Sequence, residues 1–287
     1  MSIIVGRLPG NIAGRDIIIG DLHGHPEILH RILERAEFDP SRDRVISTGD
    51  LIDRGPNSLG CLELLNEPWF FAVRGNHEQH LAAIITAVSD GLNYGQSIAR
   101  ATAHISNTVT RMGTEWFPQW LAGPSFDRQH MNAICARILT LPHILVIGDG
   151  LQRFNVVHAD LLDAGLASDD RIDAAHGLQN DHCEQTLLWS RTAYRCLQDG
   201  YDAPDLEQRL SLTFCGHNAT PLPMAWGQHM FIDTGCGYLA NPDYGLSAVI
   251  IPGGDILFEP MPPVIWGLET ADRRRILVGD KIERISP

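Results

Sequence analysis

Short apolar runs alternate with glycine-containing polar segments along the first eighty residues. The β-rich runs at residues 17–19, 44–47 and 70–73 predict three buried strands. Apolar residues at helical spacing follow the first two strands, over residues 26–38 and 59–66. Strands separated by helices in so short a segment predict a right-handed parallel βαβαβ core. Polar groups of such a core collect at the carboxyl ends of its strands.

The pattern changes after the third strand. From residue 79 to about residue 141 the apolar spacing becomes helical, which predicts a helical insertion that caps the strand ends. Further strands are expected at residues 144–147 and 154–157, and a helix near residues 185–197. Four closely spaced β-rich runs suggest a second, more antiparallel sheet: residues 211–215, 230–232, 246–251 and 255–258. We therefore expect one α/β domain over residues 1–287, with residues 79–141 as the cap and residues 260–287 as a C-terminal extension.

Composition narrows the choice of partners. The formal charge of −13 disfavours a nonspecific grip on nucleic acid or on an anionic membrane, because both need a basic surface. The basic residues are nearly all arginine, with Lys281 as the one lysine, so arginine is the side chain expected to hold phosphate. The six cysteines show no Cys-x-x-Cys spacing, which predicts reduced thiols and a cytoplasmic location. The sequence predicts neither a secretion signal nor a membrane span, and it carries no pattern that predicts an oligomeric state.

Seven polar side chains stand just after predicted strands: Asp21, His23, Asp50, Asn76, His77, His158 and His217. Taken singly, an aspartate or asparagine there is usually a turn or cap residue, and a histidine is usually an ordinary polar residue. Seven together are hard to assign independently to turns. These oxygen and nitrogen donors could hold two divalent ions, which clamp a phosphoryl group and lower the pKa of bound water from about 15.7 to about 7. Without thiolates, the set favours Mn, Fe or Zn over a closed structural zinc site.

Three segments resemble the signature motifs of the phosphoprotein phosphatase family, in order and near the usual spacing: Gly20-Asp21-Leu22-His23-Gly24, Gly49-Asp50-Leu51-Ile52-Asp53-Arg54-Gly55 and Gly75-Asn76-His77-Glu78. Three more resemble the later family motifs: Val157-His158-Ala159-Asp160, Leu188-Trp189-Ser190-Arg191 and Gly216-His217-Asn218. The chain resembles the bacterial and phage branch, typified by the lambda phage serine/threonine protein phosphatase. The matching motifs lie between residues 20 and 237, and the resemblance does not cover the cap or the tail after residue 260. It implies a calcineurin-like metallophosphoesterase fold, in which two mixed β-sheets pack as a sandwich flanked by helices.

The resemblance also implies a role for each matching residue. One metal would be held by Asp21, His23 and the bridging Asp50, and a second by Asp50, Asn76, His158 and His217. His77 would be the general acid, oriented by Asp53, and the phosphate oxygens would be held by Arg54, Arg74 and Arg191. An imidazole with a pKa of about 6.5 suits proton donation near neutral pH, and arginine forks match phosphate geometry. One departure is Asn218, which stands where many relatives carry threonine.

These features together predict a metal-dependent phosphomonoester hydrolase with two divalent ions. Mn is the expected metal, with Fe or Zn as alternatives, and a hydroxide bound to the metals is expected to attack phosphorus. The favoured interpretation is a serine/threonine protein phosphatase, with phosphotyrosine as a further candidate substrate. The alternative is a symmetrical diadenosine tetraphosphate hydrolase or another small-nucleotide phosphatase, since these share the motifs. A noncatalytic metal-stabilised protein is disfavoured because no ligand or acid position is missing. The expected partner is a phosphoprotein or a phosphorylated small molecule; a closed cap would favour nucleotides and an open groove peptides.

Overall fold

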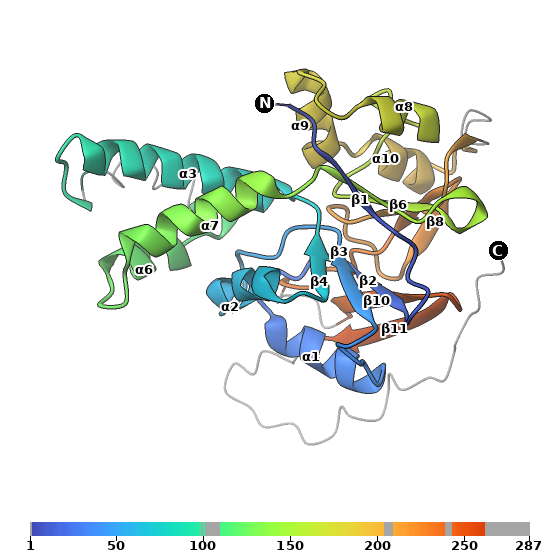
Figure 1. The fold of residues 1–287 in the computed structure, drawn as a ribbon, viewed down its shortest axis with the longest axis horizontal. Coiled ribbons are helices and arrows are strands. Elements are labelled where there is room, and N and C mark those ends of the chain that lie inside the picture. The colour runs from blue at the N-terminus through green and yellow to red at the C-terminus, as the bar shows by residue number, and fades with distance from the viewer. Residues whose placement is uncertain (1, 99, 101–109, 204–208, 239–242, 262–287) are drawn as a thin grey trace.

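Two mixed β-sheets lie at the centre of the fold and pack face to face, with helices on their outer faces (Figure 1). The computed structural model describes residues 2–261, apart from residues 99, 101–109, 204–208 and 239–242. Beyond residue 261, the predicted C-terminal extension lies outside the described residues. The expected architecture of two mixed sheets flanked by helices is confirmed.

The first sheet contains the parallel core predicted from the sequence. Its strands run in the order β11 (Asp255–Pro260), β10 (Gly245–Ile251), β2 (Asp16–Ile19), β3 (Arg44–Ser47) and β4 (Phe70–Ala72). The strands β2, β3 and β4 are parallel to one another, whereas β10 is antiparallel to both β2 and β11. The carboxyl ends of β2, β3 and β4 therefore meet at one edge of the sheet.

The second sheet has six strands, in the order β1 (Val5–Leu8), β5 (Ile144–Ile147), β6 (Phe154–Val157), β7 (Thr213–Cys215), β9 (His229–Phe231) and β8 (Met224–Trp226). The sequence pattern had not indicated β1 or β8. It was also wrong to place the last four β-rich runs in one sheet. The strands β7 and β9 belong here and are parallel to β6, while β10 and β11 complete the first sheet. Strand partners depend on contacts with distant segments, which a local pattern does not record.

Alternating side chains on each strand separate three apolar cores. In β2, Ile18 faces the second sheet, while Ile17 and Ile19 face the helices outside the first sheet. In β5, Leu145 and Ile147 face the first sheet in the same way. Because successive side chains of a strand point to opposite faces, a continuous apolar run is required wherever both faces are buried.

Helices cover the two outer faces (Figure 1). The first sheet carries α1 (Pro26–Arg35) and α2 (Ser58–Glu63), which continues into a 3-10 turn, η1 (Leu64–Asn66). The second sheet carries α8 (Asp169–Ala174), α9 (Asp181–Trp189) and α10 (Thr192–Gln198), and a 3-10 turn, η2 (Gly150–Gln152), precedes β6. The single helix expected near residues 185–197 is thus two helices, interrupted at Ser190 and Arg191.

Three helices extend away from the sheets at the left of Figure 1: α3 (Asn76–Asn93), α6 (Trp116–Ala122) and α7 (Arg128–Thr140). They occupy the region predicted as the cap, although α3 begins at Asn76, before residue 79. The division of the chain into a domain with a cap stays a prediction. None of the described helices is long and apolar enough to cross a membrane.

Arg74 joins the beginning of α3 to the end of α7. Its side chain is buried, with 1% exposed. The guanidinium donates to the carbonyl oxygens of Leu139 (2.6 Å) and Leu141 (3.1 Å), and to Gln79 Oε1 (2.9 Å). Carbonyl groups at a helix C-terminus have no partner within the helix, so this side chain satisfies acceptors that would otherwise be buried alone.

We expect Arg74→Met to lower the free energy of unfolding by about 1–3 kcal/mol, the usual effect of leaving buried acceptors unsatisfied. Urea denaturation of the metal-free protein measures this difference. Arg137→Met is the matched control, because Arg137 is exposed and its guanidinium donates to a single carbonyl among the described residues, that of Leu65 at 2.8 Å. A fully stable Arg74→Met protein with a raised KM would contradict this structural role.

Candidate metal centre

The side chains predicted from strand ends come together where the two sheets meet. Asp21 and His23 follow β2, Asp50 follows β3, and Asn76 and His77 open α3 just after β4. From the second sheet, His158 follows β6 and His217 follows β7. All seven are buried. Parallel strands in both sheets deliver their carboxyl ends to the same place, which is why residues almost 200 positions apart are neighbours.

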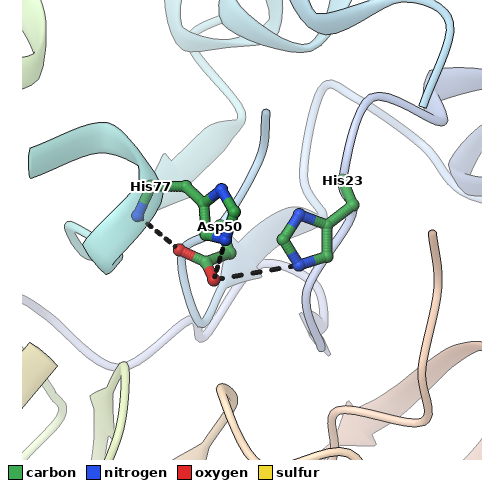
Figure 2. Close-up of side chains that lie close together, drawn as sticks. All are labelled: His23, Asp50 and His77. Atoms are coloured by element: carbon green, nitrogen blue, oxygen red, sulfur yellow. Dashed lines mark hydrogen bonds and ion pairs between the residues drawn. The ribbon is translucent and has the colours of Figure 1, made fainter. Parts of the chain in front are cut away.

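Asp50 lies at the centre of this cluster. Its Oδ2 is 3.8 Å from Nε2 of both His23 and His77, and its Oδ1 accepts the backbone N–H of His77 at 3.0 Å (Figure 2). The same Oδ2 is 3.4 Å from His158 Nε2. The ligand atoms form two groups, His23–Asp50–His77 and Asp50–His158–His217, each within 4.8 Å. One carboxylate therefore serves two groups of possible metal ligands.

The backbone at the site is held in an unusual conformation. Five of the six described non-glycine residues with positive φ lie in the loops that follow β2, β3 and β7: His23 (43°), Asp50 (48°), Asp53 (73°), Arg54 (64°) and His217 (62°). The left-handed region is costly for residues with a Cβ, and such strain concentrates at functional sites.

Two glycines allow the backbone to approach the carboxylates closely. A Cβ on Gly75 would lie 2.2 Å from Asp50 Oδ1, and one on Gly216 would lie 2.1 Å from Asp21 Oδ1. Both distances are shorter than any real contact of a Cβ, so a side chain at either position would displace a carboxylate. These glycines therefore help to position Asp21 and Asp50.

Glu78 holds the backbone around Asp50 in place. Its two carboxylate oxygens accept the backbone N–H groups of Asp50 (2.9 Å), Leu51 (2.8 Å) and Gly75 (2.9 Å). Burial, and then the neighbouring Asp50 carboxylate, raise the pKa of Glu78 to about 7. In the sequence, Glu78 ends the motif Gly75-Asn76-His77-Glu78 and was a candidate to support the ligands from outside the cluster, and its three bonds to backbone N–H groups agree with such a role.

Hydrogen bonds set the ring orientation of two histidines. His23 Nδ1 is 2.8 Å from the Ile52 carbonyl, and His158 Nδ1 is 2.9 Å from the Thr48 carbonyl. A carbonyl can only accept, so each Nδ1 carries the proton and each Nε2 faces the cluster. His158 Nε2 is also 2.8 Å from Asn76 Oδ1, which places the predicted amide ligand beside it.

The electrostatics of the cluster suit divalent cations. Burial and the nearby carboxylates of Asp233 and Asp50 raise the pKa of Asp21 well above its usual value. Burial, followed by the charge of His158, lowers the pKa of His217 to about 2, so this ring is neutral. Its buried Nε2 has no hydrogen-bond partner among the described residues. Crowded carboxylates and an unshared imidazole lone pair are both satisfied by a cation, so the residues present fit a metal centre.

His77 and Asp53 form a buried pair beside the first group. His77 Nδ1 is 2.6 Å from Asp53 Oδ2. Burial alone would lower the pKa of His77, but the carboxylates of Asp50 and Asp53 outweigh it and raise that pKa. Asp53 also accepts hydrogen bonds from Thr114 Oγ1 (2.9 Å) and Trp116 Nε1 (2.7 Å). Thr114 and Trp116 lie in the predicted cap and carry no motif, so sequence analysis missed them.

The structure brings two of the three predicted phosphate-binding arginines to the cluster. Arg54 Nη1 is 2.6 Å from His23 Nε2, and its guanidinium lies over the ring of Tyr238, 4.4 Å from the centroid. The exposed Arg191 donates to Asn218 Oδ1 at 2.8 Å, and its charge contributes to lowering the pKa of the nearby His217.

Arg74 does not join these two arginines. Its guanidinium is turned towards the end of α7 and is engaged there by carbonyl groups. Its contacts therefore do not support the phosphate role expected from the motif. The departure at Asn218, by contrast, has a structural consequence, because its amide oxygen holds Arg191.

Comparison with known proteins agrees with this geometry. The sequence profile of the calcineurin-like phosphoesterases matches residues 15–257. Serine/threonine-protein phosphatase 1 of Salmonella typhimurium is 31% identical over 218 residues, which are 76% of this chain and 85% of that protein. The symmetrical bis(5'-nucleosyl)-tetraphosphatase of Methylococcus capsulatus is 45% identical, but only over 73 residues, 25% of this chain and 26% of that protein.

The fold has solved counterparts as well. A crystal structure described as that of a candidate diadenosine tetraphosphatase superposes with a TM-score of 0.57 at 22% identity, covering 90% of this chain and 98% of the other. At that identity the likeness concerns the fold. The family implies a dinuclear divalent metal centre, which the two histidine and aspartate groups fit. With its profile match and its similarity to bacterial serine/threonine phosphatases, this chain belongs to the calcineurin-like phosphoesterase family, and it is an enzyme of the metallophosphoesterase class.

Proposed function

We propose that the protein is a serine/threonine protein phosphatase that hydrolyses phosphomonoesters. The observation that carries this proposal is the Asp50 carboxylate shared by two ligand groups, beside the His77–Asp53 pair and two arginines. The protein-phosphatase substrate is favoured because similarity to the Salmonella phosphatase extends over 85% of that protein, against 26% for the tetraphosphatase. Phosphotyrosine is a further candidate substrate.

Two divalent ions belong to this proposal. Asp21, His23 and Asp50 would hold one, and Asp50, Asn76, His158 and His217 the other, with Mn as the first choice and Fe or Zn as alternatives. Such ions supply Lewis-acid activation of water and of the phosphoryl group. His77 lies within reach of the first group, but we assign that position to Asp21, whose Oδ2 is 4.0 Å from His23 Nε2.

The chain's own groups bind the phosphate and move the proton. Arg54 and Arg191 present guanidinium groups beside the two ligand groups, where they can hold phosphate oxygens. The bond between His77 Nδ1 and Asp53 leaves Nε2 directed towards the cluster. From Nε2 a proton can pass to the leaving oxygen while the hydrogen bond to Asp53 keeps the ring oriented.

The alternative is a symmetrical diadenosine tetraphosphate hydrolase, supported by the 45% identity over 73 residues to the Methylococcus protein. The two functions are separated by assaying metal-reconstituted protein on a phosphoserine peptide and on diadenosine tetraphosphate side by side. We expect selective cleavage of the peptide. Selective cleavage of the dinucleotide would favour the alternative, and inactivity towards both with metal bound would overturn the proposal.

Replacing His77 with asparagine is expected to lower kcat by roughly 100-fold to 10,000-fold, the usual contribution of a general acid or base. Metal analysis should find two ions still bound, because His77 is not an assigned ligand, whereas Asp21→Asn should reduce the metal content. His130→Asn, on the exposed side of α7, is the control and should keep the full rate. If His77→Asn lost one ion and Asp21→Asn kept both, His77 would be the metal ligand and Asp21 would not.

Metal binding should release protons. In the metal-free protein, burial alone would lower the pKa of His158, but the Asp50 carboxylate outweighs burial. The pKa is raised to about 10, so this ring is charged at neutral pH. A ligand imidazole must be neutral, so binding displaces at least one proton, and affinity should weaken about tenfold for each pH unit lowered. Calorimetry in buffers of different ionisation enthalpy measures the proton count. An affinity independent of pH between about pH 6 and pH 8 would contradict the expectation.

A further inference from the structure

The buried carboxylate of Asp53 receives more hydrogen bonds from the cap than from His77. Its side chain is completely buried. His77 Nδ1 reaches Oδ2 at 2.6 Å, Thr114 Oγ1 donates to the same oxygen at 2.9 Å, and Trp116 Nε1 donates to Oδ1 at 2.7 Å. Two of the three side-chain donors therefore come from residues more than 60 positions further along the chain.

We propose that Thr114 and Trp116 are positioning residues for the reaction, acting through Asp53 on His77. The inference rests on the proposed role of His77 as the acid, and it goes further by making the cap part of the catalytic machinery. Neither residue belongs to the two ligand groups.

The physical reason is the cost of a buried charge. An ionised carboxylate removed from water is stable only if donors surround its oxygens. Thr114 and Trp116 supply donors to both oxygens, so the carboxylate plane is fixed and Oδ2 stays aligned with His77 Nδ1. Without them, the Asp53 carboxylate could rotate, and the His77 ring would lose its orientation. The proton on Nε2 would then be presented to the leaving oxygen less often.

The segment that carries these donors is anchored on both sides. Before it, the Gly113 carbonyl accepts the backbone N–H of Arg54 at 3.0 Å. Gly113 has a φ of 76°, and a Cβ there would lie 3.3 Å from Arg54, so glycine permits this close approach. After it, Phe117 of α6 is completely buried in the apolar core. A backbone hydrogen bond on one side and core packing on the other thus hold the two donors beside Asp53.

Two conservative substitutions test the proposal. Thr114→Val removes the hydroxyl and Trp116→Phe removes the indole N–H, while each keeps an apolar group of related shape. Trp120→Phe is the matched control, because Trp120 lies on the same helix and packs against Phe126 and His130, away from Asp53. The assay uses the metal-reconstituted enzyme and a series of aryl phosphates, from a dinitrophenyl ester to a phenyl ester.

We expect each variant to lose about tenfold in kcat on the phenyl ester, as is usual when a supporting hydrogen bond is removed. The dinitrophenyl ester should be affected little, because its leaving group needs no proton. KM and the number of bound ions should stay unchanged, and Trp120→Phe should keep the wild-type ratio of the two rates. Equal losses on both esters would show a merely structural role and overturn the proposal.

A second measurement does not depend on activity. In the metal-free protein, the proton in the 2.6 Å bond between His77 Nδ1 and Asp53 should give a low-field NMR signal. Thr114→Val and Trp116→Phe should shift or broaden that signal, and Trp120→Phe should not. An unchanged signal in both variants would overturn the positioning role. If His77→Asn loses more rate on the phenyl ester than on the dinitrophenyl ester and the two variants do not, only the positioning role fails. If His77→Asn loses the same rate on both esters, the assignment of His77 as the acid fails as well.

Discussion

The buried carboxylate of Asp50 is the group on which the site depends. It is 2% exposed, and its Oδ2 lies within 4 Å of imidazole nitrogens from two loops and the first turn of α3. A lone charge at that depth would be strongly unfavourable, so its surroundings have to compensate it. Glu78 holds the backbone at Asp50, Gly75 allows the chain to approach it, and the imidazoles of His77 and His158 lower its pKa well below the usual value, against the effect of burial.

The same buried charges explain why the site favours bound cations. Burial raises the pKa values of Asp21 and Asp233, and repulsion from the Asp50 carboxylate adds to the rise. His217, by contrast, is neutral and buried, with a ring nitrogen that no described group satisfies. The left-handed backbone conformations in the site loops cost conformational energy, which the packing of the two sheets has to offset. Sites arranged for charge stabilisation commonly carry such a cost in stability.

The helices α3, α6 and α7 are connected to this charge network at two points. Arg74 joins the end of α7 to the start of α3, directly before Asn76 and His77. On the other side, Thr114 and Trp116 bind the carboxylate that faces His77. An element that projects away from the sheets in Figure 1 is therefore attached at its base to the residues proposed to act on the leaving group. This attachment is the structural basis for the proposed orientation of His77.

By itself, the sequence determined the local features of this protein. Apolar runs located the strands of the parallel core, and the polar residues that end them included every predicted metal ligand, because a strand end is defined by neighbouring residues. Only the tertiary structure decided how the last strands divide between the two sheets, that Arg74 turns towards α7, and that Thr114 and Trp116 meet Asp53. Each of these depends on which distant segments pack together, and the partners of Asp53 lie 61 and 63 residues away along the chain. Side-chain direction and strand pairing are properties of the packed core, and a local pattern carries no record of them.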